Sequence, residues 1–288
     1  TEVFAQYKRY VQLLKWLTLA LFAYVATLFM VDVPWGEALR GMVVPSVSFT
    51  PEYVTMIVAV LGTTISPYLF FWQASEEAEE VELNPDSDPL KCAPEEAPAE
   101  LERIELDTLI GMGFSNLVAL AIMLTAAATL HAANITNIET SAQAAEALRP
   151  IAGEYASTIF ALGIVGTGLL AVPVLAGSAA YALGEAADRP VGLDKKPRRA
   201  KTFYAAIVAA TLIGAGINLT PIDPIEALYW AAVINGVVAV PVMAMMMLMS
   251  RRPDVMGRFT IRGSLLWLGW IATLAMGAAV AAMAILSI

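Results

Sequence analysis

The sequence predicts an all-α integral membrane protein, and three observations carry that prediction. Hydrophobic residues make up 58% of the 288 positions, with a mean hydropathy of +0.67, whereas soluble domains hold about 45–50% apolar residues. The excess lies in long apolar runs separated by short polar loops, which is the pattern of membrane-spanning helices. Lys and Arg lie only at the ends of these runs or between them.

Seven apolar runs are candidates for transmembrane helices, since a span needs roughly 17–25 predominantly apolar residues. They form a single membrane domain over residues 1–288, with spans near 13–33, 52–73, 106–131, 155–183, 203–219, 224–249 and 263–287. The fifth is the shortest. The fourth is longer than a bilayer needs and contains Pro173, so we expect a tilt or a kink there.

The distribution of basic residues predicts the orientation of the spans. With a cytoplasmic N-terminus, fifteen of the seventeen Lys and Arg residues lie on the cytoplasmic side, and only Arg40 and Arg149 lie outside. Positive charge accumulates on the cytoplasmic side of membrane proteins. We therefore expect a multi-pass protein of a bacterial inner or plasma membrane, with its C-terminus outside.

Charged residues are concentrated in two segments of the chain, one acidic and one basic. The chain has a net charge of −9, and thirteen of its 26 acids lie between Glu76 and Asp107. We expect residues 74–105 to form an acidic, solvated cytoplasmic loop. A basic run from Lys195 to Lys201 is typical of a positive-inside anchor that touches anionic lipid headgroups, rather than of a nucleic-acid patch.

Several function classes have no support in the sequence. The chain holds one cysteine and one histidine, His131, so neither a disulfide framework nor a Cys/His metal cluster can form within it. We find no phosphate-binding loop and no Ser/His/Asp pattern. We therefore expect no enzymatic activity, no cofactor and no nucleic-acid partner, but a lipid bilayer around the chain.

The stretch GTTISPYLFFWQ, residues 62–73, interrupts the second span at its midpoint. Pro67 has no N–H and frees the carbonyl of Thr63, while Gly62 adds backbone freedom. Such a break survives in a bilayer only where protein or a watery cavity satisfies the freed groups.

Two interpretations of this break remain open. Discontinuous helices mark substrate and ion sites in secondary transporters, and the carbonyls together with the hydroxyls of Thr63, Thr64 and Ser66 suit a hard cation. Alternatively, the break is a proline kink whose hydroxyls bond back to their own helix.

The seven spans carry no acid near their centres. Asp32, Glu52, Asp107 and Glu226 all lie at span ends. Because a dehydrated divalent cation normally needs a carboxylate, a cation site here would require a ligand that the seven spans do not supply.

Six stretches carry a resemblance to a known family. They are GTTISPYLFFWQASEE, GFSNLVALAIMLTAAATLHA, GTGLLAVPVLAGSAAYALGEA, GLDKKPRRAKTFY, DPIEALYWAAVINGVVAVPVM and VMGRFT. In this order, and over nearly the full length, the chain resembles the C-terminal part of an Nramp-type divalent metal transporter. It is most similar to the Nramp-related branch that carries magnesium.

The resemblance implies a fold of about eleven helices, the first ten forming two inverted five-helix repeats. The seven spans would then be helices five to eleven. The first four helices would precede Thr1, which makes the sequence look truncated. They would include a second broken helix whose Asp-Pro motif supplies the metal-binding carboxylate.

The resemblance also assigns residues. Where Nramp metal transporters have Met-Pro-His, this chain has Ser66-Pro67-Tyr68. Ser66 replaces a soft thioether, which favours hard cations, and Tyr68 replaces a histidine linked to proton handling. Thr63 takes the position whose carbonyl faces the metal. These departures favour Mg²⁺, and Mn²⁺ also accepts oxygen ligands.

Two asparagines within the spans match family positions near the substrate, Asn235 in VINGVV and Asn116 in FSNLV. The alternative for each is an interhelical hydrogen bond. The resulting expectation is secondary transport of divalent cations, Mg²⁺ and also Mn²⁺. The alternatives are a proton-coupled Mn²⁺/Fe²⁺ transporter of the same family and a non-transporting membrane scaffold or sensor with the acidic loop as its partner surface.

Overall fold

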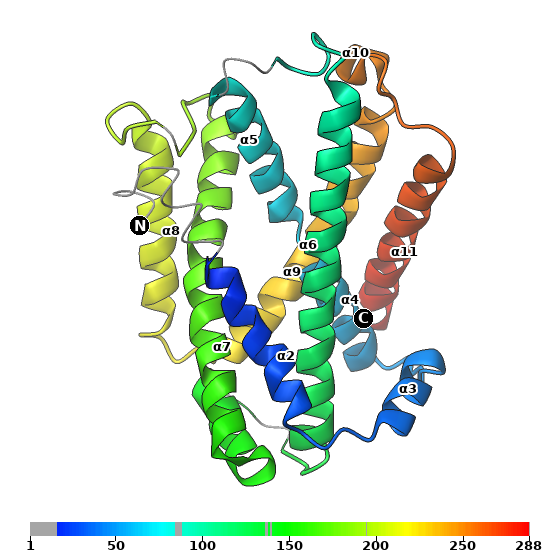
Figure 1. The fold of residues 1–288 in the computed structure, drawn as a ribbon, viewed down its shortest axis with the longest axis vertical. Helices are drawn as coiled ribbons and strands as arrows, with labels where there is room; N and C mark the ends of the chain where they lie inside the picture. The colour runs from blue at the N-terminus through cyan, green and yellow to red at the C-terminus, as the bar shows by residue number, and fades with distance from the viewer. Residues whose placement is uncertain (1–15, 84–87, 136–137, 139, 194, 288) are drawn as a thin grey trace. The chain divides into compact units, whose positions relative to one another are not determined.

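The computed structural model describes residues 16–83, 88–135, 138, 140–193 and 195–287, and within this part every regular element is helical (Figure 1). The elements in chain order are η1 (Thr18–Leu21), α2 (Phe22–Phe29), α3 (Trp35–Val43), α4 (Pro51–Ile65), α5 (Pro67–Leu83), α6 (Ala97–Ala126), η2 (Ala127–His131), α7 (Ser141–Ala186), α8 (Lys201–Ile217), α9 (Pro224–Met249), α10 (Pro253–Met256) and α11 (Ser264–Leu286).

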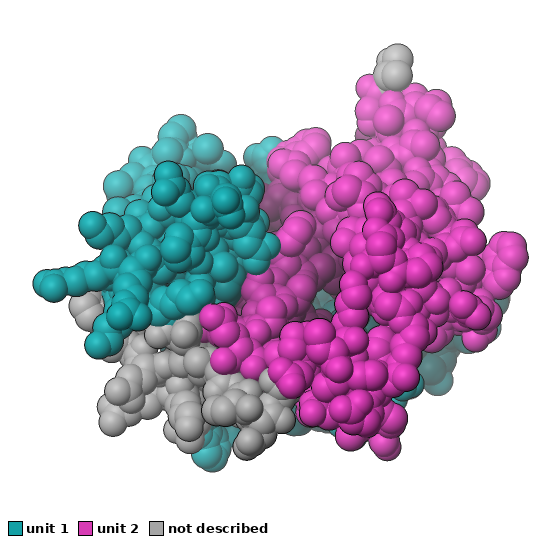
Figure 2. All heavy atoms as spheres, turned by 90° about the horizontal axis from the view of Figure 1, so that it is seen from above, with its two compact units in different colours: residues 1–46, 104–226 teal, residues 47–103, 227–288 magenta. Residues whose placement is uncertain are grey.

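The chain divides into two compact units, coloured separately in Figure 2. Unit 1 holds residues 1–46 and 104–226, and unit 2 holds residues 47–103 and 227–288. The boundaries lie between α3 and α4, about two turns into α6 and within the first turn of α9. The single membrane domain expected from the sequence stays a prediction.

Five helical segments are long and apolar enough to cross a membrane: 51–82, 97–131, 153–186, 224–249 and 264–286. Two shorter apolar helices, 18–29 and 201–217, complete the set. All seven fall where the sequence predicted spans, although only residues 16 onward of the first span are described. The count of seven spans stays a prediction, since the shorter two have 12 and 17 residues.

In unit 1, α7 packs against α8 on one side and against η1 and α2 on another. Thr140 begins α7 with a capping box, in which its hydroxyl accepts from the Gln143 N–H and its own N–H donates to the Gln143 side chain, both at 3.2 Å. The non-helical backbone within α7 lies at Gly153 (φ 88°, ψ 169°). Only a glycine takes such dihedrals without strain. Gly153 precedes the predicted span 155–183, so the tilt or kink expected of the span that contains Pro173 stays a prediction.

Close packing holds α2 against α7. A Cβ on Gly163 would lie 3.2 Å from the Tyr24 ring, and the Thr167 hydroxyl donates to the Tyr24 hydroxyl at 3.2 Å. Small residues let helix backbones approach in membranes. The packing role expected for glycines on this helix therefore applies at Gly163.

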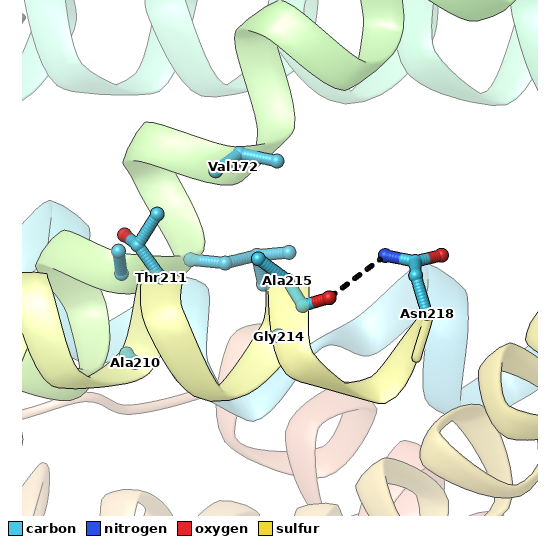
Figure 3. A pocket seen from close by; sticks show the side chains of 8 residues that line it. Val172, Ala210, Thr211, Gly214, Ala215 and Asn218 are labelled. Carbon is cyan, nitrogen blue, oxygen red and sulfur yellow. Dashed lines mark hydrogen bonds between the residues drawn. The ribbon is translucent and has the colours of Figure 1, made fainter. Parts of the chain in front are cut away.

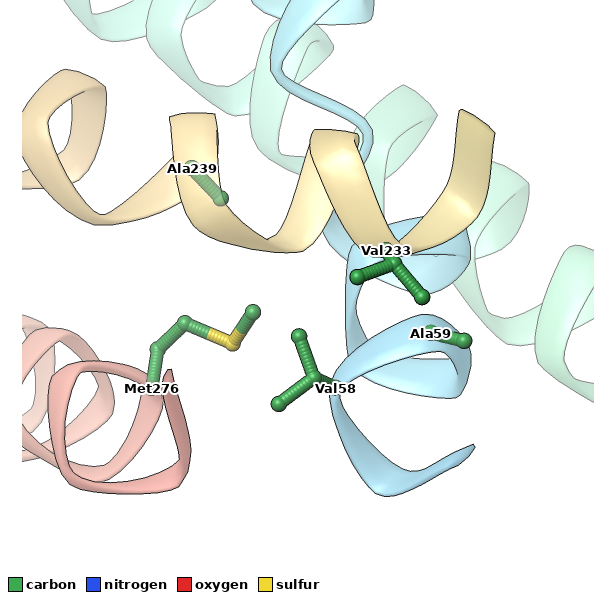
Figure 4. Packing of buried hydrophobic residues seen from close by; sticks show 5 residues of the cluster. All are labelled: Val58, Ala59, Val233, Ala239 and Met276. Atoms are coloured by element: carbon green, nitrogen blue, oxygen red, sulfur yellow. The ribbon is translucent and has the colours of Figure 1, made fainter. Parts of the chain in front are cut away.

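In unit 2, α4 begins at Thr50, whose hydroxyl accepts from the Tyr53 N–H at 3.3 Å, with Pro51 at the first helical position. Three helices then enclose a buried core. Figure 4 shows its members, which come from α4, α9 and α11: Val58, Ala59, Val233, Ala239 and Met276. This core fixes the helix that carries the interruption.

The acidic segment is largely helical in the structure rather than a loop. α5 continues to Leu83, and α6 already begins at Ala97. Arg103 of α6 contacts three carboxylates, Glu77 at 2.8 Å, Glu100 at 2.9 Å and Glu80 at 4.0 Å. The Arg103 guanidinium donates to Glu100 and Glu77 and so offsets the repulsion between acids along α5.

Candidate functional site

The interruption predicted at residues 62–73 is a true break between two helices. α4 ends at Ile65, α5 begins at Pro67, and Ser66 between them has φ 41° and ψ 80°. Left-handed backbone is uncommon for a residue other than glycine and is concentrated at functional sites. Ser66 is 2% exposed, so the break is also buried.

Ser66 satisfies several of the backbone groups that the break frees. Its N–H donates to the Gly62 carbonyl at 3.0 Å, its hydroxyl donates to the Thr63 carbonyl, and its own carbonyl accepts from the Leu69 N–H at 2.9 Å. Thr64 and Ile65 are the last two residues of α4, and the last carbonyls of a helix have no partner within the helix itself. The end of α4 thus presents backbone oxygens with spare acceptor capacity.

The threonine hydroxyls bond back to their own helix, as the kink interpretation expected. Thr63 donates to the Ala59 carbonyl at 2.7 Å, and Thr64 donates to the Val60 carbonyl at 2.8 Å. Each hydroxyl oxygen keeps lone pairs that can still coordinate a cation. The hydroxyl hydrogens of these threonines make the bonds that the kink interpretation expected. Their oxygen lone pairs remain available, as the cation-site interpretation requires.

The break begins one turn beyond a very close helix crossing. A Cβ on Gly62 would lie 2.8 Å from the Cα of Gly236 and would also overlap backbone atoms of Ala232 and Gly236. A Cβ on Gly236 would lie 2.7 Å from the Val58 carbonyl oxygen. Glycine at both positions is what lets α4 and α9 approach this closely.

Asn235 precedes Gly236 on α9 and is half-buried. Residues three and four apart share a helix face, so Asn235 lies at the flank of the face formed by Ala232 and Gly236. That face meets α4 one turn before the break. The structure thus gathers five predicted residues in unit 2, namely Thr63, Thr64, Ser66, Tyr68 and Asn235.

Asn116 differs from the other predicted residues. It lies on α6 in unit 1, is exposed, and donates from its side chain to the Met112 carbonyl of its own helix at 2.8 Å. Its assignment to the site stays a prediction.

The donor set around the break is neutral oxygen. Among the residues that the structure describes, no group of three or more His, Cys, Asp or Glu side chains could hold a metal ion. Carbonyl, hydroxyl and amide oxygens suit hard cations such as Mg²⁺ and Mn²⁺ rather than soft metals. These neutral oxygens can coordinate a cation together with a carboxylate, but they do not themselves balance the charge of the cation.

Two features of the site escaped the sequence analysis. The Ser66 side chain satisfies the carbonyl that Pro67 was expected to free, and Gly236 makes the helix crossing. Serine before proline is a frequent turn signal, and a glycine inside an apolar helix is a frequent packing signal. Neither signal tells which other residue of the chain the serine or the glycine will contact.

A separate pocket lies between α7 and α8 in unit 1 (Figure 3). Its volume is about 450 Å³, and it is lined by Val172, Leu175, Ala176, Ala210, Thr211, Gly214, Ala215 and Asn218. The Asn218 amide donates to the Ala215 carbonyl at 3.5 Å. Apart from Thr211 and Asn218, the side chains that line this pocket are apolar.

The long apolar helices and the buried helix break define the class of the protein, a multi-pass integral membrane protein with a discontinuous helix. The family follows from comparison. The profile of the Nramp family, described as natural resistance-associated macrophage protein-like, matches residues 2–286. The chain belongs to this family.

Several curated proteins resemble the chain. Each is named divalent metal cation transporter MntH. The protein of Deinococcus radiodurans is 24% identical over 77% of this chain and 47% of its own length. That of Erwinia tasmaniensis is 31% identical over 51% of the chain and 33% of its own length, and that of Vibrio campbellii is 26% identical over 69% and 43%. The chain spans less than half the length of these relatives.

Proposed function

We propose that the chain is part of a secondary transporter for divalent metal cations, with Mg²⁺ as the favoured substrate and Mn²⁺ as a second one. The observation that carries the proposal is the buried break at Ser66, where α4 ends in carbonyls with spare acceptor capacity. Broken helices of this kind form ion sites in secondary transporters. Membership of the Nramp family supports the same function.

The proposed ligands are oxygens on both sides of the α4–α9 crossing. The Thr63 carbonyl and the Ser66 hydroxyl are hydrogen-bonded partners, so both can turn toward one ion. The Thr64 oxygens on α4, Tyr68 on α5 and the Asn235 amide on α9 are further candidates, while Asn116 on α6 is a sixth. A carboxylate from outside the described residues would complete the charge balance.

The preference for Mg²⁺ rests on the chemistry at position 66. A hydroxyl is a hard ligand, and Mg²⁺ keeps part of its water shell because it dehydrates reluctantly. No thioether stands at the break itself, so nothing there favours a softer metal. Alternating access would rock one helix bundle against another around the site.

Uptake by the complete gene product tests the proposal. The protein would be reconstituted into liposomes that contain a Mg²⁺-sensitive dye, with protein-free liposomes as the control. We expect saturable Mg²⁺ entry that external Mn²⁺ inhibits. Entry no faster than in protein-free liposomes, for either ion, would remove the transport proposal.

A proton-coupled Mn²⁺/Fe²⁺ transporter is the second candidate. It fits the relatives, each of which is named divalent metal cation transporter MntH. Against it stands Tyr68, which takes the position where the resemblance places a histidine linked to proton handling. Internal acidification that accompanies Mn²⁺ entry, followed with a pH-sensitive dye, would select this candidate over uncoupled Mg²⁺ transport.

The third candidate is a scaffold or sensor, which partner binding in the absence of ion uptake distinguishes from both transporters. Its partner surface would be the acidic helical extensions of α5 and α6. Such a protein would bind a partner without moving ions, so a silent uptake assay combined with partner capture lost on deletion of residues 76–103 would favour it.

A further inference from the structure

The basic segment before α8 is an ordered turn in the structure. The N–H groups of Arg199 and Ala200 donate to the Lys196 carbonyl at 2.8 and 3.3 Å, and α8 begins at Lys201. We call residues 195–200 the basic turn. It exposes Lys196, Arg198 and Arg199, while Ala200 is 1% exposed.

Buried aromatic residues hold the basic turn in place. The Tyr204 hydroxyl donates to the Lys195 carbonyl at 2.9 Å and lies 3.3 Å from the Leu193 carbonyl, and the Leu193 N–H donates to the Tyr181 hydroxyl at 3.3 Å. The Phe203 ring packs edge-on against both tyrosine rings, with centroids at 4.8 and 5.3 Å. The turn is therefore fixed to the ends of α7 and α8.

The exposed cations of the turn lack acidic partners among the described residues. No ion pair involves Lys196, Arg198 or Arg199, and the first turn of α8 contains no acid. The described acids nearest in the sequence, Glu185 and Asp188, precede the turn. Positive charge thus accumulates here in a chain whose net charge is −9.

The sequence predicts α8 as a membrane span, which places the turn at the level of lipid headgroups. α8 has 17 residues and is about 25 Å long, slightly less than the ~30 Å hydrocarbon core. Its apolar side chains Val208, Leu212 and Ile213 are 46–68% exposed, which suits contact with lipid acyl chains. Lys201 at its start must then lie at the membrane–water boundary, with the basic turn directly beside it.

We propose that the basic turn binds the phosphate groups of anionic phospholipids through Lys196, Arg198 and Arg199. Arginine matches phosphate in a bidentate geometry, and clustered cations next to a membrane helix attract anionic lipid. A lipid fits better than an acidic protein or a nucleic acid, because the cations are held beside an exposed apolar helix surface that suits acyl chains. The inference is independent of the transport proposal.

The test uses the purified chain in a neutral detergent, with dioleoylphosphatidylglycerol and dioleoylphosphatidylcholine titrated separately and bound lipid counted by native mass spectrometry. We expect Arg198→Gln/Arg199→Gln to weaken the apparent affinity for phosphatidylglycerol by ~20-fold, about fivefold for each charge, at low salt. Phosphatidylcholine binding should not change. The matched control, Arg40→Gln/Arg149→Gln, removes the same charge elsewhere and should keep phosphatidylglycerol binding.

Two further sets of measurements separate the effect of charge from that of the turn's geometry, and lipid binding from the binding of other anions. Arg198→Lys/Arg199→Lys should retain most of the binding, and Tyr204→Phe, which keeps every charge but loses the hydrogen bonds to the turn, should weaken it by ~3-fold. Phosphatidylglycerol affinity that is unchanged in the glutamine variant would overturn the proposal. Inorganic phosphate that competes as strongly as phosphatidylglycerol would also overturn it. So would a glutamine variant that loses binding to polyglutamate or RNA but keeps binding to lipid. Size-exclusion profiles identify any variant that does not fold.

Discussion

Gly62 of α4 and Gly236 of α9 meet backbone to backbone, one turn before the helix breaks at Ser66. A Cβ on Gly62 would lie 2.8 Å from the Gly236 Cα, and a Cβ on Gly236 would lie 3.0 Å from the Met276 Cε in addition to overlapping Val58. These neighbours include main-chain atoms, which cannot move aside as a flexible side chain can. The crossing therefore fixes the position of α9 relative to the end of α4.

Gly236→Ala should force α4 and α9 apart. We expect it to lower the free energy of unfolding by ~1–3 kcal/mol, the usual cost of overpacking, and to reduce cation uptake by the complete protein. Thermal unfolding of the purified chain in detergent measures the first effect. Gly168→Ala is the matched control, since a Cβ at Gly168 meets nothing within 4 Å, and it should unfold at or above the wild-type temperature. Equal melting of both variants would contradict the role of the crossing.

Ser66→Met introduces a soft ligand at the break. If Ser66 coordinates the substrate, we expect the ratio of Cd²⁺ or Mn²⁺ uptake to Mg²⁺ uptake to rise by about tenfold, the effect of roughly 1.4 kcal/mol of differential binding. Competition uptake in liposomes measures this ratio. Ser115→Met is the control, because Ser115 is exposed on α6 and bonds to the Met112 carbonyl of its own helix. A ratio that Ser66→Met leaves unchanged would remove Ser66 from the ligand set.

The sequence allowed the helical membrane fold and the position of the break to be predicted, because hydropathy and Pro67 are local signals. It did not reveal that Ser66 takes a left-handed conformation and satisfies the Thr63 carbonyl, since that bond depends on how the chain turns. Gly236 could not be paired with Gly62 from the sequence, because contacts between distant helices leave no local pattern. Nor did the sequence reveal the interruption of α7 at Gly153, because a glycine permits a positive φ but does not require one.

Arg103→Met should loosen the acidic extension of α5. The guanidinium contacts Glu77, Glu80 and Glu100, and its removal leaves these acids to repel one another. Since Arg103 is 39% exposed, we expect a loss of only ~1 kcal/mol in stability. Faster amide hydrogen exchange should be confined to peptides from residues 76–83 and 97–103. Arg149→Met, which removes a single longer pair with Glu146 at 3.8 Å, should leave exchange in these peptides unaltered.

Pro67→Ala tests whether the break itself is needed. The alanine restores an N–H that can donate to the Thr63 carbonyl, which now accepts from the Ser66 hydroxyl, and helix propensity favours alanine over proline by about 3 kcal/mol in a helix interior. We expect α4 and α5 to approach one continuous helix, with unchanged or higher thermal stability and with cation uptake reduced by at least ~10-fold. A stable variant that transports at the wild-type rate would show that carbonyls freed by the break are not ligands. Leu69→Ala, two residues into α5 and exposed, is the control for a substitution that leaves the break intact and should transport normally.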